Sequence, residues 1–296
     1  MSLAPRAVLV HRTTEYEELV ARHGTHGQAA FFLSSRGRDI EEVAERHRRA
    51  RRALAEVTAA VPLNWRQALL ERADLDRFLF APEDVVVVVG QDGLVANAAK
   101  YLDGQPVIGI DTDPGRNPGV LVRHRPRDAA ALLASAQGTA EELTMVEAVT
   151  DDTQRLVALN EIYLGAPGHQ TARYRLGLDG DRGVVETQAS SGVLVGTGTG
   201  ATGWLRSVWQ ERGGTLPLPA PTEDRLLWFV REAWPSPATG TSLVGGGLTA
   251  SASLTLTVES DRLIAFGDGI ESDALQLTWG QTVRVGVCGR RLRLVG

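Results

Sequence analysis

The chain has 296 residues, 43% of them hydrophobic and 23% charged, which suffices for two domain cores at about 150 residues per domain. Its net charge of -5 excludes the overall positive field of a nucleic-acid-binding protein, so we expect small-molecule substrates and no nucleic acid. The single cysteine, Cys288, excludes an internal disulfide, no histidine pair has zinc-site spacing, and no apolar run reaches the ~18 residues of a membrane span. We therefore expect a cytoplasmic protein that binds neither a membrane nor a structural metal.

The N-terminal part alternates strand and helix patterns. Residues 7–10 predict a strand, and Thr14 and Glu17 have the spacing of a capping box, which begins a helix that ends near Gly24. The apolar residues 29–33 predict a second strand.

A long helix is predicted from about Asp39, where apolar residues recur at helical spacing. Residues 46–52 of this helix are rich in arginine. Because glutamates such as Glu45 stand four residues before arginines such as Arg49, the pattern favours a solvated face over a phosphate or membrane patch.

Residues 84–89 form a continuous run of one aspartate and five valines, which predicts a central parallel strand buried on both faces. The turn Gly90-Gln91-Asp92-Gly93 follows, and residues 94–100 predict a helix. A turn between the carboxyl end of a parallel strand and a helix is where α/β sheets bind phosphates. Its glycines allow backbone amides to approach phosphate oxygens.

Asp92 in this turn suggests phosphoryl transfer. A carboxylate that faces phosphate is repelled unless a metal ion or a hydroxyl proton lies between them, and an aspartate accepts the substrate's hydroxyl proton in such reactions. The tetrapeptide alone leaves open a second interpretation, an aspartate that caps the following helix. A P-loop is excluded, because the only lysine, Lys100, lies between Ala99 and Tyr101.

The pattern changes after residue 125, and short alternating runs are separated by turn residues. The clearest are residues 174–178 before Asp179-Gly180, 254–258 before 259–261, and 283–287 before Gly289. We predict an N-terminal domain of residues 1–125 and a mostly β domain of residues 126–296, with residues 126–150 as the crossover.

Residues 198–203 satisfy the Gly-x-Gly-x-x-Gly spacing of dinucleotide-binding turns after the strand-like residues 193–195. That fingerprint belongs to a β-α-β unit, whereas this segment lies in the β-rich part. A simple glycine-rich turn therefore remains the alternative.

The turn at Asp92 resembles the Gly-Gly-Asp-Gly turn of the ATP–NAD kinase family, although lipid kinases and phosphofructokinases have related turns. Further segments resemble the family in the same order. Residues 106–114, and residues 190–192 together with 197–204, have the form typical of mitochondrial-type NAD kinases and their bacterial relatives. Residues 158–161 resemble the family's Asn-Glu motif, and residues 266–269 resemble its late Asp-Gly turn.

This resemblance implies a Rossmann-like α/β domain followed by a β-sandwich-like domain, with the site in the cleft between them. It implies transfer of the γ-phosphoryl group of ATP, with Mg²⁺, to the 2′-hydroxyl of the adenosine ribose of NAD, which gives NADP. It also implies a homo-oligomer, a dimer or a tetramer.

By the same resemblance Asp92 is the catalytic proton acceptor. The nucleotide-binding residues would be Gly90, Gln91, Gly93, Asp111, Asn160, Glu161, Thr199, Thr202, Gly203, Trp204 and Asp268.

Three residues depart from the family pattern: Gln91 replaces the second glycine, Leu94 a threonine, and Asp111 an asparagine. These three departures leave open whether the activity is reduced or redirected to another substrate. The alternatives are a lipid or other small-alcohol kinase of the same superfamily, a catalytically attenuated regulator that binds NAD or ATP, and, more distantly, a Rossmann oxidoreductase.

Overall fold

The computed structural model describes residues 4–116, 119–179 and 184–296. The chain forms two compact units, Met1–Glu141 with Arg293–Gly296 (unit 1) and Glu142–Leu292 (unit 2). The division lies after Glu141, whereas the sequence predicted residue 125, because the helix at residues 129–135 buries Leu132 and Leu133 in the core of unit 1.

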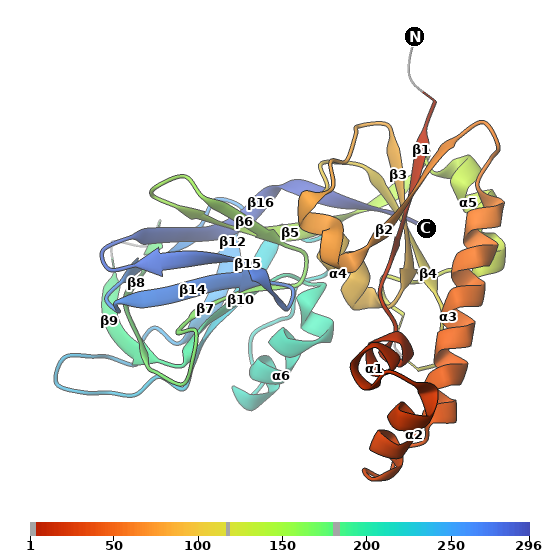
Figure 1. Cartoon of the computed structure of the whole chain (residues 1–296). Coiled ribbons are helices and arrows are strands. Elements are labelled where there is room, and N and C mark those ends of the chain that lie inside the picture. The colour runs from red at the N-terminus through yellow and green to blue at the C-terminus, as the bar shows by residue number, and fades with distance from the viewer. Residues whose placement is uncertain (1–3, 117–118, 180–183) are drawn as a thin grey trace. The chain divides into compact units, whose positions relative to one another are not determined.

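The core of unit 1 is a parallel sheet in the order β2-β1-β3-β4 (Figure 1). Its strands are β1 (Arg6–His11), β2 (Arg66–Glu71), β3 (Asp84–Gly90) and β4 (Pro106–Asp111). The valine strand β3 lies between β1 and β4 and is buried from Asp84 to Val89, as its composition predicts. Near the C-terminus, Arg293 and Leu294 pair in parallel with β4.

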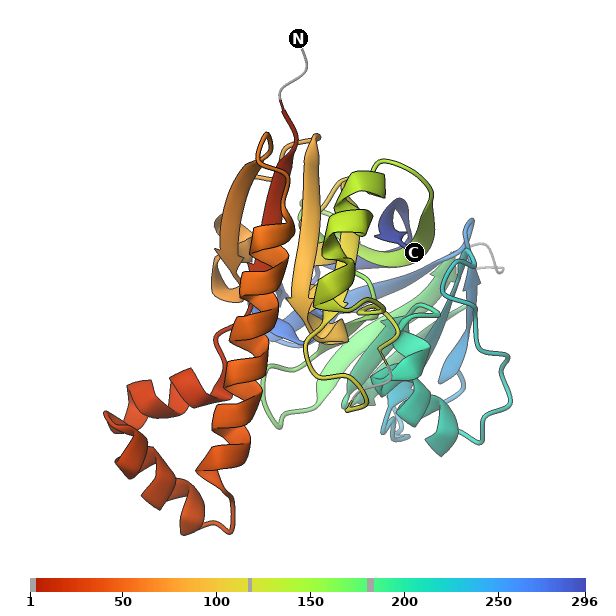
Figure 2. The same ribbon diagram turned by 90° about the vertical axis from the view of Figure 1, so that its right-hand side faces the viewer.

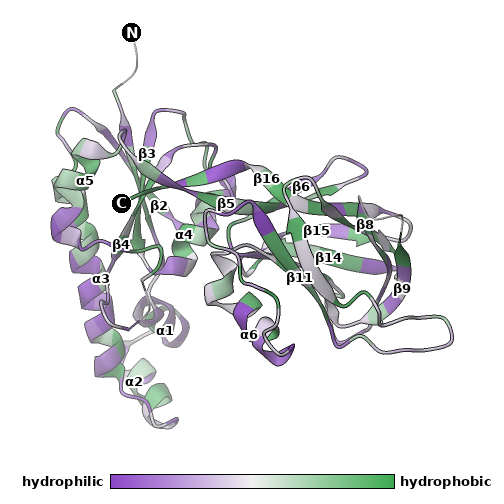
Figure 3. Cartoon of the chain, turned by 180° about the vertical axis from the view of Figure 1, so that it is seen from behind, coloured by the Kyte–Doolittle hydropathy of each residue, from purple (hydrophilic) through white to green (hydrophobic). Residues whose placement is uncertain are grey.

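Helices cover both faces of this sheet. The long helix α3 (Ile40–Ala60) and α5 (Ala129–Ser135) pack on one face, where Leu54 and Leu133 meet Val87 in a single hydrophobic cluster (Figure 2). On α3 the apolar residues form a stripe and the other face is polar, as the colours of Figure 3 show. The helix α4 (Asp92–Ala99) follows β3, and short 3₁₀ helices lie at Arg72–Arg77 and Pro126–Asp128.

The predicted capping box is present at the first helix, α1 (Glu15–His23). Thr14 accepts a hydrogen bond from the Glu17 amide, the Glu17 carboxylate accepts one from the Thr14 amide, and Gly24 ends the helix at a φ of 83°.

The strand predicted at residues 29–33 is wrong, because these residues lie in the helix α2 (His26–Ser34). Thr25 caps the helix by accepting a bond from the Gln28 amide at 3.2 Å. Ala29 and Leu33, four residues apart, are buried on one face, whereas Phe31 is 76% exposed. A short apolar run does not distinguish a strand from a helix, and the buried spacing here is helical.

The arginine-rich part of α3 is largely exposed, as predicted, but three of its ion pairs reach beyond the helix, one of them between Arg51 and Glu17 of α1. Arg46 pairs with Glu15 at 2.7 Å, and Arg49 pairs with Asp113 at 2.8 Å. The expected Glu45–Arg49 pair is therefore replaced, and Glu45 instead pairs with Arg48 at 2.9 Å.

Unit 2 contains two antiparallel sheets that enclose one hydrophobic core, a β-sandwich. The six-stranded sheet has the order β12 (Gly245–Thr249), β11 (Arg225–Arg231), β10 (Gly192–Gly196), β7 (Glu161–Gly165), β14 (Arg262–Gly267) and β15 (Ile270–Thr278). The second sheet contains β16 (Thr282–Val295), β13 (Ser253–Val258), β8 (Ala172–Asp179) and β9 (Val185–Ser190), with β5 (Ala140–Thr150) and β6 (Arg155–Ala158) beside β16.

The strands predicted at residues 174–178, 193–195 and 254–258 are confirmed as parts of β8, β10 and β13. The end predicted near Gly289 is wrong, since β16 continues through it to Val295. Of the turn predicted at Asp179-Gly180, Gly180 lies outside the described residues.

The helix α6 (Trp204–Glu211), preceded by a 3₁₀ turn at Gly200–Thr202, packs on the outer face of the six-stranded sheet. Along β10, Val193 and Val195 face the sandwich core, and Leu194 faces Leu205 of α6. In the described part of the chain, no helix is long and apolar enough to cross a membrane.

Candidate functional site

The Asp92 turn lies at the carboxyl edge of the parallel sheet of unit 1. Gly90 is the last residue of β3 and pairs with Asp111, the last residue of β4. Gln91 is the N-cap of α4 and makes no capping bond with its side chain, and Asp92 is the first residue of the helix. The predicted succession of strand, turn and helix is therefore present.

The Asp92 carboxylate holds the loop that follows β4. Its Oδ1 accepts hydrogen bonds from the amides of Leu121 at 2.8 Å and Val122 at 2.9 Å, and its Oδ2 accepts one from Val120 at 2.9 Å. Asp92 thus neither caps its own helix, as one interpretation had it, nor points freely into solvent.

These three hydrogen bonds, the Asp92 clamp, leave the carboxylate with one unused acceptor position. A carboxylate has about four lone-pair sites, two on each oxygen. The three amides occupy both sites of Oδ1 and one of Oδ2, and the residue is partly exposed. By this count Oδ2 keeps one acceptor position for a hydroxyl hydrogen of a bound molecule.

The glycines of the turn differ in their surroundings. A Cβ on Gly93 would meet no atom within 4 Å, whereas a Cβ on Gly90 would lie 3.0 Å from Cδ2 of Leu94. Leu94 is buried and packs beside Gly90. Gln91 is exposed, and its side chain extends the polar surface of the turn.

Arginines gather beside Asp111. A small cavity of about 160 Å³ is lined by residues of α3 and of the loop after β4, namely Arg49, Arg52, Ala53, Glu56, Asp111, Thr112, Pro114, Arg125 and Pro126. Asp111 Oδ1 accepts a bond from the Asp113 amide at 2.8 Å, and Asp113 pairs with Arg49. Three guanidinium groups thus line this cavity together with the carboxylates of Asp111 and Glu56.

In unit 2, strand register brings three distant segments to one end of the six-stranded sheet. Gly196 of β10 pairs with Glu161 of β7, and Gly267 of β14 pairs with Ile162. The Asn-Glu turn before β7, the glycine-threonine loop after β10 and the Asp268 turn after β14 are therefore neighbours.

Asp268 fixes the backbone of the Asn-Glu turn. Its Oδ2 accepts from the Leu159 amide at 2.8 Å, its Oδ1 accepts from the Asn160 amide at 2.7 Å, and its own amide donates to the Glu161 carbonyl at 3.2 Å. Asp268 adopts a φ of 53°, which directs both its amide and its side chain toward this turn. A residue predicted to bind nucleotide thus supports Asn160 and Glu161 through their backbone.

Thr197, which was outside the predicted binding set, connects the glycine-threonine loop to the same turn. Its Oγ1 donates to the Leu159 carbonyl at 2.6 Å and accepts from the Thr199 amide at 3.1 Å, and its amide donates to the Asn160 carbonyl at 2.9 Å. Its place directly after the buried strand β10, in a segment that resembles the kinase family, was the signal for this role in the sequence.

The predicted residues of this loop differ in exposure. Thr199 is 1% exposed, and its buried Oγ1 has no hydrogen-bond partner among the described residues. Thr202 and Gly203 are exposed, and Thr202 Oγ1 donates to the Thr199 carbonyl at 2.9 Å. Residues 202 and 203 are thus the exposed part of the loop.

Glu161 is mostly buried in this cluster. Burial, and second the nearby charge of Asp268, raise the pKa of the Glu161 carboxyl to about 8. At neutral pH the side chain is therefore largely protonated and can donate a hydrogen bond to a ligand as well as accept one.

This raised pKa predicts a stability that falls with pH. Between the usual value of about 4.5 and about 8, the unfolded chain loses the Glu161 proton while the folded chain keeps it, so the free energy of unfolding falls by up to about 1.4 kcal/mol per pH unit. Glu161→Gln removes this contribution. In urea unfolding at pH 5 and pH 8, the variant should gain stability relative to the parent at the higher pH, and an unchanged difference between the two proteins would contradict the assignment.

Aromatic rings adjoin this cluster on the outer face of the sheet. Trp204 stacks on Tyr163 with ring centroids 5.6 Å apart, and Phe266 lies 5.1 Å from Tyr163. The Arg231 guanidinium lies 5.6 Å from the centroid of the Trp204 ring. The three rings are half-buried, so they offer faces on which a planar ligand can stack.

Within the described residues no three histidine, cysteine, aspartate or glutamate side chains cluster to hold a metal ion. The residues predicted to bind nucleotide form one group in each unit. Unit 1 brings together Gly90, Gln91, Asp92, Gly93 and Asp111, and unit 2 brings together Asn160, Glu161, Thr199, Thr202, Gly203, Trp204 and Asp268.

Comparison with known proteins agrees with this arrangement of elements. No protein-family model and no curated protein sequence matches the chain. Among solved structures, the chain is similar to an NAD kinase from Archaeoglobus fulgidus in complex with ATP, with a TM-score of 0.59 and 17% identity over 98% of this chain and 93% of that chain. The chain therefore has the fold of this NAD kinase.

Proposed function

We propose that the protein is an NAD kinase of the mitochondrial and bacterial type that transfers the γ-phosphoryl group of ATP to the 2′-hydroxyl of the adenosine ribose of NAD. The observation that carries the proposal is the spare acceptor position of Asp92 Oδ2 at the head of α4. It lies in the turn where a parallel sheet binds phosphates, and the fold is that of an NAD kinase crystallised with ATP.

In the proposed reaction Asp92 accepts the 2′-hydroxyl proton while the ribose oxygen forms a bond to the γ-phosphorus. The bond between that phosphorus and the β–γ bridging oxygen breaks, and ADP leaves with the electron pair. Mg²⁺ accompanies ATP and offsets the charge of the phosphates. The amides and loop around Asp92 keep the carboxylate oriented throughout, because Oδ1 is fully occupied.

Unit 2 supplies the groups for the dinucleotide. The Asn160 side chain offers one acceptor and two donors, and protonated Glu161 adds one donor. Trp204, stacked on Tyr163, provides a ring face. In this proposal Thr202 and Gly203 contact the ligand directly, whereas Thr199 and Asp268 position the turns that do.

A coupled assay for NADP tests the proposal. Purified protein with NAD, ATP and Mg²⁺ should form NADP and ADP in equal amounts, as a NADP-specific dehydrogenase and a separate ADP assay would measure. The absence of NADP under conditions where the protein binds NAD would overturn the kinase assignment and favour the attenuated regulator. Phosphorylation of a lipid alcohol in place of NAD would favour the other kinase class.

Gly93→Ala tests the phosphate-binding role of the turn without disturbing the fold. The new methyl group meets no atom of the chain within 4 Å, and alanine is the better helix residue, so stability should be unchanged or rise by up to about 1 kcal/mol. If the ATP phosphates approach this backbone, KM for ATP should rise about ten-fold or more. Unchanged kinetics in the stable variant would place the phosphates elsewhere.

A further inference from the structure

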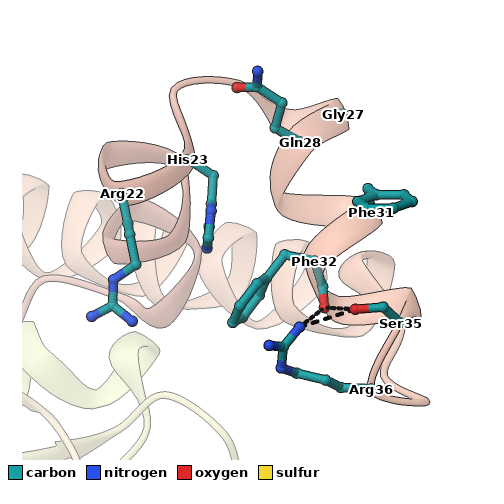
Figure 4. A pocket seen from close by; sticks show the side chains of 8 residues that line it. All are labelled: Arg22, His23, Gly27, Gln28, Phe31, Phe32, Ser35 and Arg36. Atoms are coloured by element: carbon teal, nitrogen blue, oxygen red, sulfur yellow. Dashed lines mark hydrogen bonds between the residues drawn. The ribbon is translucent and has the colours of Figure 1, made fainter.

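The helices α1 and α2 form a pocket far along the chain from every residue of the proposed kinase site. Its volume is about 540 Å³, within the range of roughly 300–1,000 Å³ that is usual for small-molecule sites. Figure 4 shows the residues that line it, which are Arg22, His23, Gly27, Gln28, Phe31, Phe32, Ser35 and Arg36.

The lining of the pocket is positively charged. It contains the guanidinium groups of Arg22 and Arg36 and no carboxylate, in a chain whose net charge is -5. Arg22 forms no ion pair with any described residue. Guanidinium groups bind phosphate in a planar, two-donor geometry, so this lining suits an anion.

Arg36 is already oriented. Its guanidinium lies 3.8 Å over the Phe32 ring, and its Nη1 donates to the Phe32 carbonyl and to Ser35 Oγ, both at 3.0 Å. Its Nε and Nη2 have no acceptor among the described residues. A guanidinium held this way loses little freedom when it binds an anion.

Aromatic rings complete the pocket. The His23 and Phe32 rings are 4.3 Å apart, and Figure 4 shows this pair between Arg22 and Arg36. The neighbouring ring of Phe31 is 76% exposed. A planar ligand ring would cover this apolar surface.

We propose that the α1–α2 pocket is a second binding site, for a planar aromatic ring that carries a phosphate group. The phosphate contacts Arg22 and Arg36, and the ring packs on the exposed ring of Phe31. The inference goes beyond the proposed kinase activity, because no residue of this pocket takes part in that reaction.

The test is a titration of the full-length protein with AMP, followed through the backbone amide NMR signals of the α1–α2 segment. Saturable shifts of Gly27, Gln28 and Arg36 are expected. The double variant Arg22→Gln, Arg36→Gln should bind AMP at this segment at least about ten-fold more weakly, because each charge-assisted bond contributes at least a factor of ten. Arg38→Gln is the matched control: Arg38 lies two residues away, pairs with Glu15 and does not line the pocket, so binding should change less than two-fold.

Parallel titrations with inorganic phosphate and with adenosine distinguish the two halves of the ligand, and each should bind at least ten-fold more weakly than AMP. Equal binding of phosphate and AMP would overturn the role of the rings.

Three results would overturn the site. They are the absence of shifts, equal binding by the parent and the double variant, and shifts that depend on protein concentration without AMP, which indicate a second copy of the chain. NADP formation by the double variant should stay at the parental rate, so the two proposals fail independently.

Discussion

Asp92→Asn is expected to lower kcat for NADP formation by about 10²–10⁴, the usual contribution of a positioned proton acceptor. The amide keeps the size of the carboxylate, and its oxygen can still accept from Leu121 and Val122. Its NH₂ group, however, cannot accept a ribose proton. NAD affinity, measured by calorimetry, should stay within a few-fold of the parent, because the variant loses the base and retains the turn.

The same substitution also weakens the loop clamp, and Gly119→Ala separates the two effects. In Asp92→Asn, the amide nitrogen faces the Val120 amide, an unsatisfied contact that costs about 1–3 kcal/mol of stability. Gly119 has a φ of 66° and directly precedes the clamped residues, so alanine there strains the same loop by about 1–2 kcal/mol while Asp92 stays intact. We expect Gly119→Ala to retain more than a tenth of the parental kcat. Equal loss of kcat in both variants would show that Asp92 serves the loop alone.

Gly200→Ala is expected to abolish NAD binding at concentrations that saturate the parent, and to destabilise unit 2 by about 1–3 kcal/mol. A Cβ on Gly200 would lie 2.3 Å from the Asn160 carbonyl oxygen and 3.0 Å from Glu161 Oε2. The backbone must therefore move, and with it the hydrogen bond from Thr197 to Asn160. Calorimetric titration with NAD and urea unfolding measure the two effects.

Gly168→Ala is the matched control in the same unit. A Cβ there meets no atom within 4 Å, and the residue lies in the turn between β7 and β8. Its stability and NAD affinity should equal those of the parent. Parental NAD affinity in Gly200→Ala would contradict the assignment of the Asn160-Glu161 turn to the dinucleotide.

Patterns formed by residues close in sequence predicted many of the helices and strands. The capping box at Thr14 and the valine strand after Asp84 depend on neighbours in sequence, and both form as expected. Residues 29–33 formed a helix because burial of Ala29 and Leu33 against α1 and α3 decides between two structures that the apolar run allows equally. Gly289 suggested an end for β16, yet the strand continues because its last residues pair with β4.

Sequence patterns did not predict the hydrogen bonds that the Asp92 and Asp268 carboxylates make with distant backbone amides. Asp92 binds amides 28–30 residues away, and Asp268 binds amides 107–109 residues away. Such pairings follow from strand order and register, which no local spacing encodes. The resemblance to a kinase family identified both aspartates as important, but it did not indicate that each of them shapes a neighbouring backbone segment.

The strand β16 pairs with strands of both units, so a chain divided between the units would lose a strand from unit 1. Residues 282–286 pair with β13 in unit 2, and Arg293 and Leu294 pair with β4 in unit 1. A fragment of residues 1–141 would lack that final strand and expose the hydrogen-bonding edge of β4, which is prone to pair with other chains. Autonomous expression of the α/β unit would thus require grafting the C-terminal segment back, for example by circular permutation.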